Sequence, residues 1–185
     1  PNATATGDDL VGVPDDEDGV ILPAVFTDGT STSLTVVASA AGLLNAWIDW
    51  NGNGSWLDAG EQVFVDQAVV AGPNPLAISV PALSTGGLSF ARFRIDSGGG
   101  LAPSGAAPDG EVEDHAVELN RHPVATGHTI ERFPTQPVKV LVSELLAGDT
   151  DPDGDGVSFV GVTSPSANGG QVEHSGNRVF YTPPP

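Results

Sequence analysis

The 185-residue sequence predicts an all-β fold made of two β-sandwich modules in tandem. Short stretches in which apolar and polar residues alternate recur along the chain, as expected for strands with one buried face. The chain contains 24 Gly and 16 Pro, and their clusters between these stretches favour turns over helices. The acidic charge is concentrated in the first two thirds, which indicates a boundary between the modules near residues 120–123.

Alternation locates the strands in chain order. In the first module, residues 1–120, it predicts strands at 33–39, 43–50, 62–70, 76–80, 88–95 and 113–119. In the second module, residues 121–185, it predicts strands at 138–142, 157–162 and 178–181. The stretch VSELL at 142–146 is long enough for one helical turn only.

The charge of the chain excludes several classes of partner. Six basic residues against 24 acidic ones give a formal net charge of -18. Such a surface repels nucleic acid and anionic membranes. No apolar run approaches the roughly 20 residues of a membrane span, so no membrane insertion is expected. Cysteine is absent, which excludes disulfides and thiolate metal sites.

The segment DWNGNGSWLDAGE at residues 49–61 has the alternating oxygen donors of a calcium loop. The candidate ligands are Asp49, Asn51, Asn53, Ser55, Asp58 and Glu61. An EF-hand loop would place its final Glu one residue earlier, where this chain has Gly60. The alternative interpretation is an Asn-Gly-rich hairpin turn whose acids face solvent.

A second acidic segment, GDTDPDGDG at residues 148–156, places a carboxylate at every second position. Its candidate calcium ligands are Asp149, Asp151, Asp153 and Asp155. Four carboxylates this close repel one another, and a divalent cation would replace that repulsion with attraction. The alternative interpretation is a solvated acidic turn.

Two further acidic segments, 15–19 and 109–115, lie far apart in the sequence. In a strand, Glu111 and Glu113 share one face, and so do Arg92 and Arg94. We expect these four residues to form structural ion pairs across a sheet. The remaining carboxylates are candidates for a third ion site, formed by Asp16, Asp18 and Asp114.

The string GEVED at residues 110–114 resembles the motif that names the GEVED domain family of secreted bacterial proteins. Four further strings also resemble that family: PNATATGDD, DDEDGV, AWIDWNGNGSWLDAGE and ARFRID. One departure is His115, where the family string continues with Tyr. The resemblance covers nearly all of residues 1–120. It implies a β-sandwich module of large surface or secreted proteins, with the 49–61 loop as its calcium loop.

Residues 122–185 resemble the cadherin-like or Ig-like repeats of bacterial adhesins. The strings that carry this resemblance are HPVATG, AGDTDPDGDGVSFVGVTSPSANGGQV and VFYTP. Such repeats commonly hold calcium between strands or domains, and they continue past the last of these strings with at least one more strand. The resemblance therefore implies an Ig-like sandwich that is truncated, or that is completed by a neighbouring molecule.

These features predict a calcium-stabilised extracellular module, structural or adhesive, of a large bacterial surface or secreted protein. Its expected partners are calcium ions and neighbouring modules or like subunits. A more specific version of this hypothesis is a fibre in which each subunit completes the sheet of the next by strand complementation. The alternative is a carbohydrate-binding accessory module of a secreted enzyme, in which Trp47, Trp50 and Trp56 stack on glycans. The four His residues lie in no catalytic motif, so no enzyme activity is expected.

Overall fold

The structure, a computed structural model, describes residues 19–184 and is almost entirely β, which confirms the predicted fold class. The chain divides after Arg121 into two compact units, residues 1–121 and 122–185. Among the described residues, the first unit contains two sheets and the second unit contains one.

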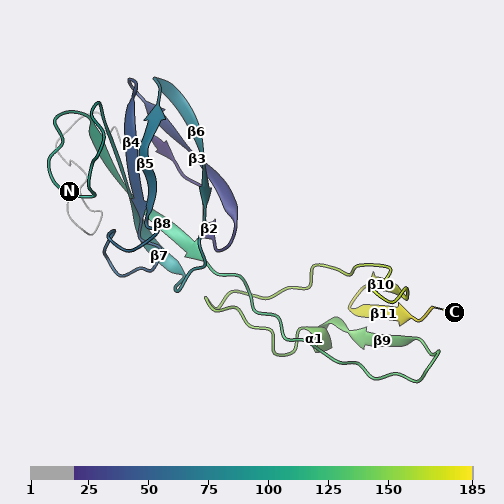
Figure 1. The fold of residues 1–185 in the computed structure, drawn as a ribbon. Coiled ribbons are helices and arrows are strands. Elements are labelled where there is room, and N and C mark those ends of the chain that lie inside the picture. Colours follow the sequence, from purple (N-terminus) through teal and green to yellow (C-terminus); the bar gives the residue numbers. More distant parts are fainter. Residues whose placement is uncertain (1–18, 185) are drawn as a thin grey trace. The chain divides into compact units, whose positions relative to one another are not determined.

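The first unit packs two sheets face to face, and Figure 1 shows them as two layers. The smaller sheet contains, in order, β1 (Val20–Ile21), β3 (Ser31–Ala38) and β6 (Gly72–Ser79). The larger sheet contains, in order, β2 (Phe26–Thr27), β8 (Glu111–Asn120), β7 (Gly87–Asp96), β4 (Gly42–Ile48) and β5 (Gln62–Val69). Among the described residues of this unit, the strand pairs are antiparallel except that of β2 with β8.

The core lies between these two sheets because each strand turns every second side chain inward. Leu34 and Val36 of β3 and Leu44 and Phe93 of the larger sheet are buried there. The six strands predicted in this module correspond to β3, β4, β5, β6, β7 and β8, with ends that differ by a few residues. The two-residue strands β1 and β2 are too short to show any alternation.

The outer face of the larger sheet is also covered. Asn45 and Trp47 of β4 pair with Arg94 and Arg92 of β7, and all four residues are at most 2 % exposed. These side chains alternate with the core residues and therefore point away from the core. The 97–110 loop, which joins β7 to β8, lies over them.

The second unit contains one antiparallel sheet in the order β10 (Gln171–Ser175), β11 (Arg178–Thr182) and β9 (Val138–Leu141). The single-turn helix α1 (Val142–Leu145) follows β9, as predicted. The predicted strand at 157–162 does not form, although the Phe159 ring lies 4.9 Å from the His174 ring. An alternating pattern supplies an apolar face, but a strand also needs a hydrogen-bonded neighbour.

Candidate metal centre

The 49–61 loop begins where β4 ends, and its first carboxylate closes it. Asp49 is 2 % exposed and accepts hydrogen bonds from the backbone N–H groups of Asn53, at 3.2 Å, and Gly54, at 2.8 Å. Gly54 has φ +80°, a conformation that favours glycine. This arrangement folds the loop back over Asp49.

Successive side-chain oxygens of this loop accept backbone N–H groups two residues further on. Asn51 Oδ1 accepts from Asn53 N at 3.0 Å, and Asn53 Oδ1 accepts from Ser55 N at 2.8 Å. Ser55 Oγ then accepts from Leu57 N at 3.1 Å. Asn and Ser favour such turns because their short side chains reach their own backbone. The alternating oxygen donors are thus brought into one compact loop.

Asp58 lies on the open side of the loop, where it is exposed. Its Oδ2 accepts hydrogen bonds from the amide groups of Asn53, at 2.7 Å, and Asn51, at 3.2 Å. These two bonds lower the pKa of Asp58 below its ordinary value of 3.8. The loop therefore holds Asp58 as a carboxylate that faces the two asparagines.

Glu61 closes the loop from the buried side. It is 1 % exposed, and its Oε2 accepts a hydrogen bond from Asp58 N at 3.3 Å. Its Oε1 has no hydrogen-bond partner within the described part of the chain. Burial, and then the charges of Asp49 and Asp58, raise the pKa of Glu61 above 4.5. A buried carboxylate oxygen without a donor is costly, and a cation beside it would remove that cost.

The donor set of the 49–61 loop fits calcium in its chemistry. Calcium prefers carboxylate, amide and carbonyl oxygens, and this loop offers all three. Within residues 19–184 no three Asp, Glu or His side chains form a metal-binding group. A calcium ion in this loop would therefore depend on the oxygens of Asn51, Asn53 and Ser55 as well as on the carboxylates.

The four carboxylates of the second acidic loop, residues 148–156, make two kinds of contact. Asp149 Oδ1 accepts a hydrogen bond from Thr126 N at 2.7 Å and so ties the loop to the start of this unit. Asp151 Oδ1 accepts from Asp153 N, at 2.8 Å, and from Asp155 N, at 3.4 Å. Asp151, Asp153 and Asp155 therefore belong to one turn, whereas Asp149 makes its contact with another segment.

The ion pair of Arg92 is not the one that we predicted. Arg92 pairs with Asp114, with Nε 2.6 Å from Oδ1, instead of with Glu111 or Glu113. The strand register places Asp114 directly opposite Arg92, and Val112 opposite Arg94. A shift of one residue in register exchanges the two faces of a strand, so the two glutamates fall on the other face.

Glu113 and Arg94 therefore have different roles from those predicted. Glu113 lies opposite Phe93 on the core face, is 6 % exposed, and has its Oε2 3.0 Å from Nε2 of His115. Arg94 donates to the carbonyl oxygens of Ala102 and Gly105 in the 97–110 loop. Burial, and then the charge of Arg92, lower the pKa of Arg94.

Of the third ion site that we predicted, only Asp114 lies within the described residues. Both oxygens of Asp114 accept hydrogen bonds from Arg92, which already supplies the counter-charge. An ionised carboxylate keeps lone pairs beyond those that an Arg occupies, so this ion pair by itself does not decide whether Asp114 binds a cation, and the third ion site stays a prediction. Asp16 and Asp18 lie outside the described residues.

The structure also contains a polar cluster that the sequence patterns did not single out. Asn45 Nδ2 donates to Asp66 Oδ1 at 2.8 Å, and Gly100 N donates to the same oxygen at 2.6 Å. The amide of Asn45 is the larger cause of a lowered pKa at Asp66. The signal in the sequence was an asparagine within an otherwise apolar strand, in LLNAWI. Such a residue needs a polar partner when it is buried.

The three tryptophans are packing residues. Trp47 is 2 % exposed, and Trp50 and Trp56 are each 6 % exposed. Trp50 packs edge-on against Phe26 in the core, with ring centroids 5.5 Å apart. Since a sugar stacks on an exposed ring face, these tryptophans do not support the carbohydrate-binding alternative.

Comparisons with known proteins agree with this architecture. No curated protein matches the chain. No helix within the described part of the chain is long and apolar enough to span a membrane. The models of two families match the chain, and both families are non-catalytic modular domains. Bacterial Ig-like domains typically occur in surface or extracellular proteins. The chain matches the GEVED domain family at residues 43–118 and the bacterial Ig domain family at residues 120–185, in the order that its motifs predicted.

Proposed function

We propose that the chain is a calcium-stabilised structural or adhesive module of an extracellular bacterial protein, either secreted or held at the cell surface. The observation that carries this proposal is the Oε1 atom of Glu61, which is buried beside Asp49 and Asp58 and has no hydrogen-bond partner among residues 19–184. A calcium ion in the 49–61 loop would offset part of the negative charge of Asp49, Asp58 and Glu61 and would compensate that buried oxygen.

Calcium acts in this proposal by binding only the folded chain. The unfolded chain does not bring Asp49 and Glu61 together, so the binding free energy adds to the free energy of unfolding. The gain is about 2.7 kcal/mol when free calcium is a hundred times its dissociation constant. The loop would then join the end of β4 to the start of β5.

The second unit depends on the same effect more strongly. Val179 is its only buried apolar side chain within residues 122–184. A unit of this size with so small a core gains little stability from apolar burial. Calcium bound in this turn, with backbone oxygens beside the carboxylates of Asp151, Asp153 and Asp155, would reduce the repulsion among them and so stabilise the turn.

The test is thermal unfolding of the whole chain in calcium, in magnesium and in chelator. We expect chelation to lower the melting temperature by many degrees and magnesium to restore little of it, because magnesium gives up its water reluctantly. Calorimetric titration with calcium should show saturable binding to the same protein. A melting temperature that ignores both calcium and chelator would reject the proposal.

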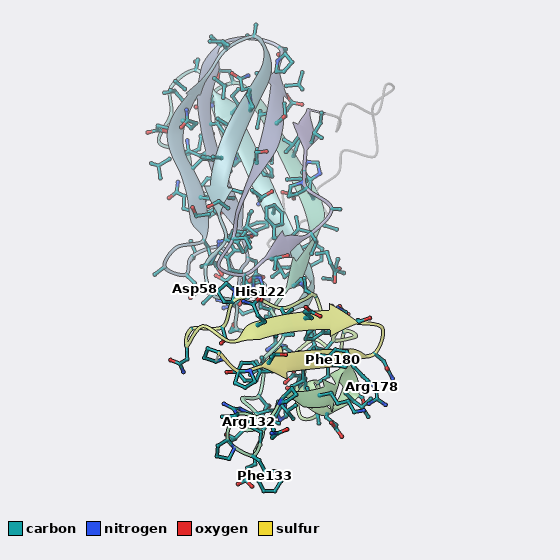
Figure 2. All side chains as sticks on the ribbon, turned by 90° about the vertical axis from the view of Figure 1, so that its right-hand side faces the viewer. Asp58, His122, Arg132, Phe133, Arg178 and Phe180 are labelled. Carbon is teal, nitrogen blue, oxygen red and sulfur yellow. The ribbon has the colours of Figure 1, made fainter. Side chains whose placement is uncertain are left out.

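A second candidate function is self-assembly into a fibre by strand complementation. Within the described residues, β9 and β10 are the outer strands of their sheet, so each has one edge without a partner strand. Apolar side chains also lie at the surface of this unit, with Val160 98 % and Phe133 81 % exposed. Phe180 of the central strand β11 is also partly exposed, and Figure 2 labels it together with Phe133.

Light scattering and electron microscopy of the chain in calcium test the fibre. Strand complementation predicts concentration-dependent growth. A proline in an edge strand, as in His174→Pro, should abolish this growth because proline cannot donate to a ladder; Val172 is less suitable because its N–H already donates to Ser164 Oγ. A chain that stays monomeric in calcium at high concentration would exclude the fibre and leave the calcium-stabilised module intact.

A further inference from the structure

The 97–110 loop, which joins β7 to β8, is held down by two buried arginines. Arg92 Nη1 donates to the carbonyl oxygen of Pro103 at 2.7 Å. Arg94 Nη2 donates to the carbonyl oxygen of Gly105 at 2.8 Å, and its Nη1 donates to that of Ala102. Hydrogen bonds from a charged donor are among the strong ones, so these contacts fix the middle of the loop.

Arg92 is also the point at which this loop meets the 49–61 loop. The guanidinium carbon of Arg92 lies 4.1 Å from the centroid of the Trp56 ring, with Arg92 0 % and Trp56 6 % exposed. The ring therefore covers a cation that also contacts Pro103 and Asp114. Such a contact is strongest when both partners are removed from water.

Trp56 is placed by its neighbours in the loop. It directly follows Ser55 and stands two residues before Asp58, and both are candidate calcium ligands. Its Nε1 is buried without a hydrogen-bond partner in the described part of the chain. The position of the ring therefore depends on the conformation of the loop and on Arg92, and not on a hydrogen bond of its own.

We propose that calcium bound in the 49–61 loop orders the 97–110 loop through Trp56 and Arg92. This inference rests on the proposed calcium site and adds a consequence at a second place on the surface. Calcium holds the backbone on either side of Trp56, so the ring stays over Arg92 and keeps water from it. The guanidinium group then holds Pro103 more firmly. Without calcium, the ring leaves more often and the 97–110 loop loosens with it.

Hydrogen exchange followed by mass spectrometry on the whole chain tests this coupling. We expect calcium to slow exchange of the amides at 97–110 on the order of tenfold relative to chelator. In Trp56→Leu, calcium should still bind and still raise the melting temperature, but exchange at 97–110 should no longer respond to it. Leu57→Ala is the matched control, because Leu57 is 81 % exposed in the same loop, and it should behave as the parent chain does.

The outcomes separate this inference from the calcium site itself. If calcium binds and raises the melting temperature but leaves exchange at 97–110 unchanged in the parent chain, the coupling is wrong and the site stands. The coupling is also wrong if Trp56→Leu keeps the full response. If calorimetry finds no calcium binding, the site and the coupling both fail. Should Trp56→Leu not fold, Trp56→Phe keeps a ring with a weaker cation contact, and its response should fall between none and that of the parent.

Discussion

Arg92 and Asp114 face each other across β7 and β8, with Nε 2.6 Å from Oδ1 and the second carboxylate oxygen bound by Nη2. The two side chains are 0 % and 2 % exposed. Removal of one partner from such a pair leaves a buried charge without its counter-charge. The motif GEVED thus ends in the residue that neutralises a buried arginine.

Asp114→Asn should lower the free energy of unfolding of the first unit by about 3–5 kcal/mol, because Arg92 stays buried and charged. Urea denaturation monitored by tryptophan fluorescence measures this change, since all three tryptophans lie in that unit. Glu118→Gln, at an exposed position of the same strand, should change it by less than about 0.5 kcal/mol. Equal effects would mean that Asp114 acts as an ordinary surface residue.

Glu61→Gln should have opposite effects with and without calcium. In chelator the variant removes a buried charge close to Asp49 and Asp58, so the melting temperature should rise. The variant lacks one carboxylate ligand, so calcium should raise its melting temperature, relative to chelator, much less than it raises that of the parent chain. Scanning calorimetry in the two buffers checks both signs. A variant that loses stability in chelator would show that the Glu61 charge has a counter-charge in the protein.

Asp151→Asn combined with Asp153→Asn should weaken calcium stabilisation of the second unit more than that of the first. The two carboxylates belong to a turn within residues 122–185, and the substitution removes charge while keeping an oxygen donor. Hydrogen exchange in calcium and chelator, compared over the two units, measures the difference. Glu131→Gln, an exposed acid of the same unit, serves as the control. Equal loss in both units would mean that the two loops do not act locally.

Gly110→Ala should destabilise the first unit far more than Gly87→Ala. The two glycines have similar positive φ values, +93° and +90°, which disfavour alanine at both positions. At Gly110 the added Cβ would lie 1.8 Å from the carbonyl oxygen of Ile95, whereas at Gly87 nothing lies within 4 Å. Urea denaturation should separate the two variants by more than about 1 kcal/mol. Similar losses would show that strain alone accounts for both.

The contact between Ser97 and Asp109 should make the 97–110 loop sensitive to acid. Asp109 accepts hydrogen bonds from Ser97 Oγ, at 2.6 Å, and Ser97 N, at 2.9 Å, and these lower the pKa of Asp109 below 3.8. The folded state therefore binds this proton less readily than the unfolded state does. The stability that this contact contributes is present above pH 3.8 and is lost as the pH falls through the lowered pKa.

Asp109→Asn removes that dependence on pH. The difference in unfolding free energy between the parent chain and this variant should therefore shrink as the pH falls below about 4. Urea denaturation at a series of pH values measures the difference. Ser97→Ala, which removes the side-chain donor to Asp109, should also make the unfolding free energy depend less on pH in this range. A difference that stays constant with pH would mean that the Asp109 carboxylate gains nothing from Ser97.

Much of the first unit could be predicted from local pattern. Alternation located its long strands because each of them buries one face, and the Asn-Gly pairs at 51–54 indicated a tight turn between two strands. These features depend on residues close together in the sequence. Prediction from alternation fails where burial is slight, as at 157–162, because an apolar pattern does not provide a strand partner.

The sequence by itself determined the all-β class, the two family resemblances and the composition of the two acidic loops. Only the tertiary structure decided which acid neutralises Arg92, because that choice depends on the register between β7 and β8. A shift of one residue would have placed the arginines opposite Glu111 and Glu113. The burial of Glu61 and the contact between Trp56 and Arg92 were decided in the same way, by packing between segments that are distant in the chain.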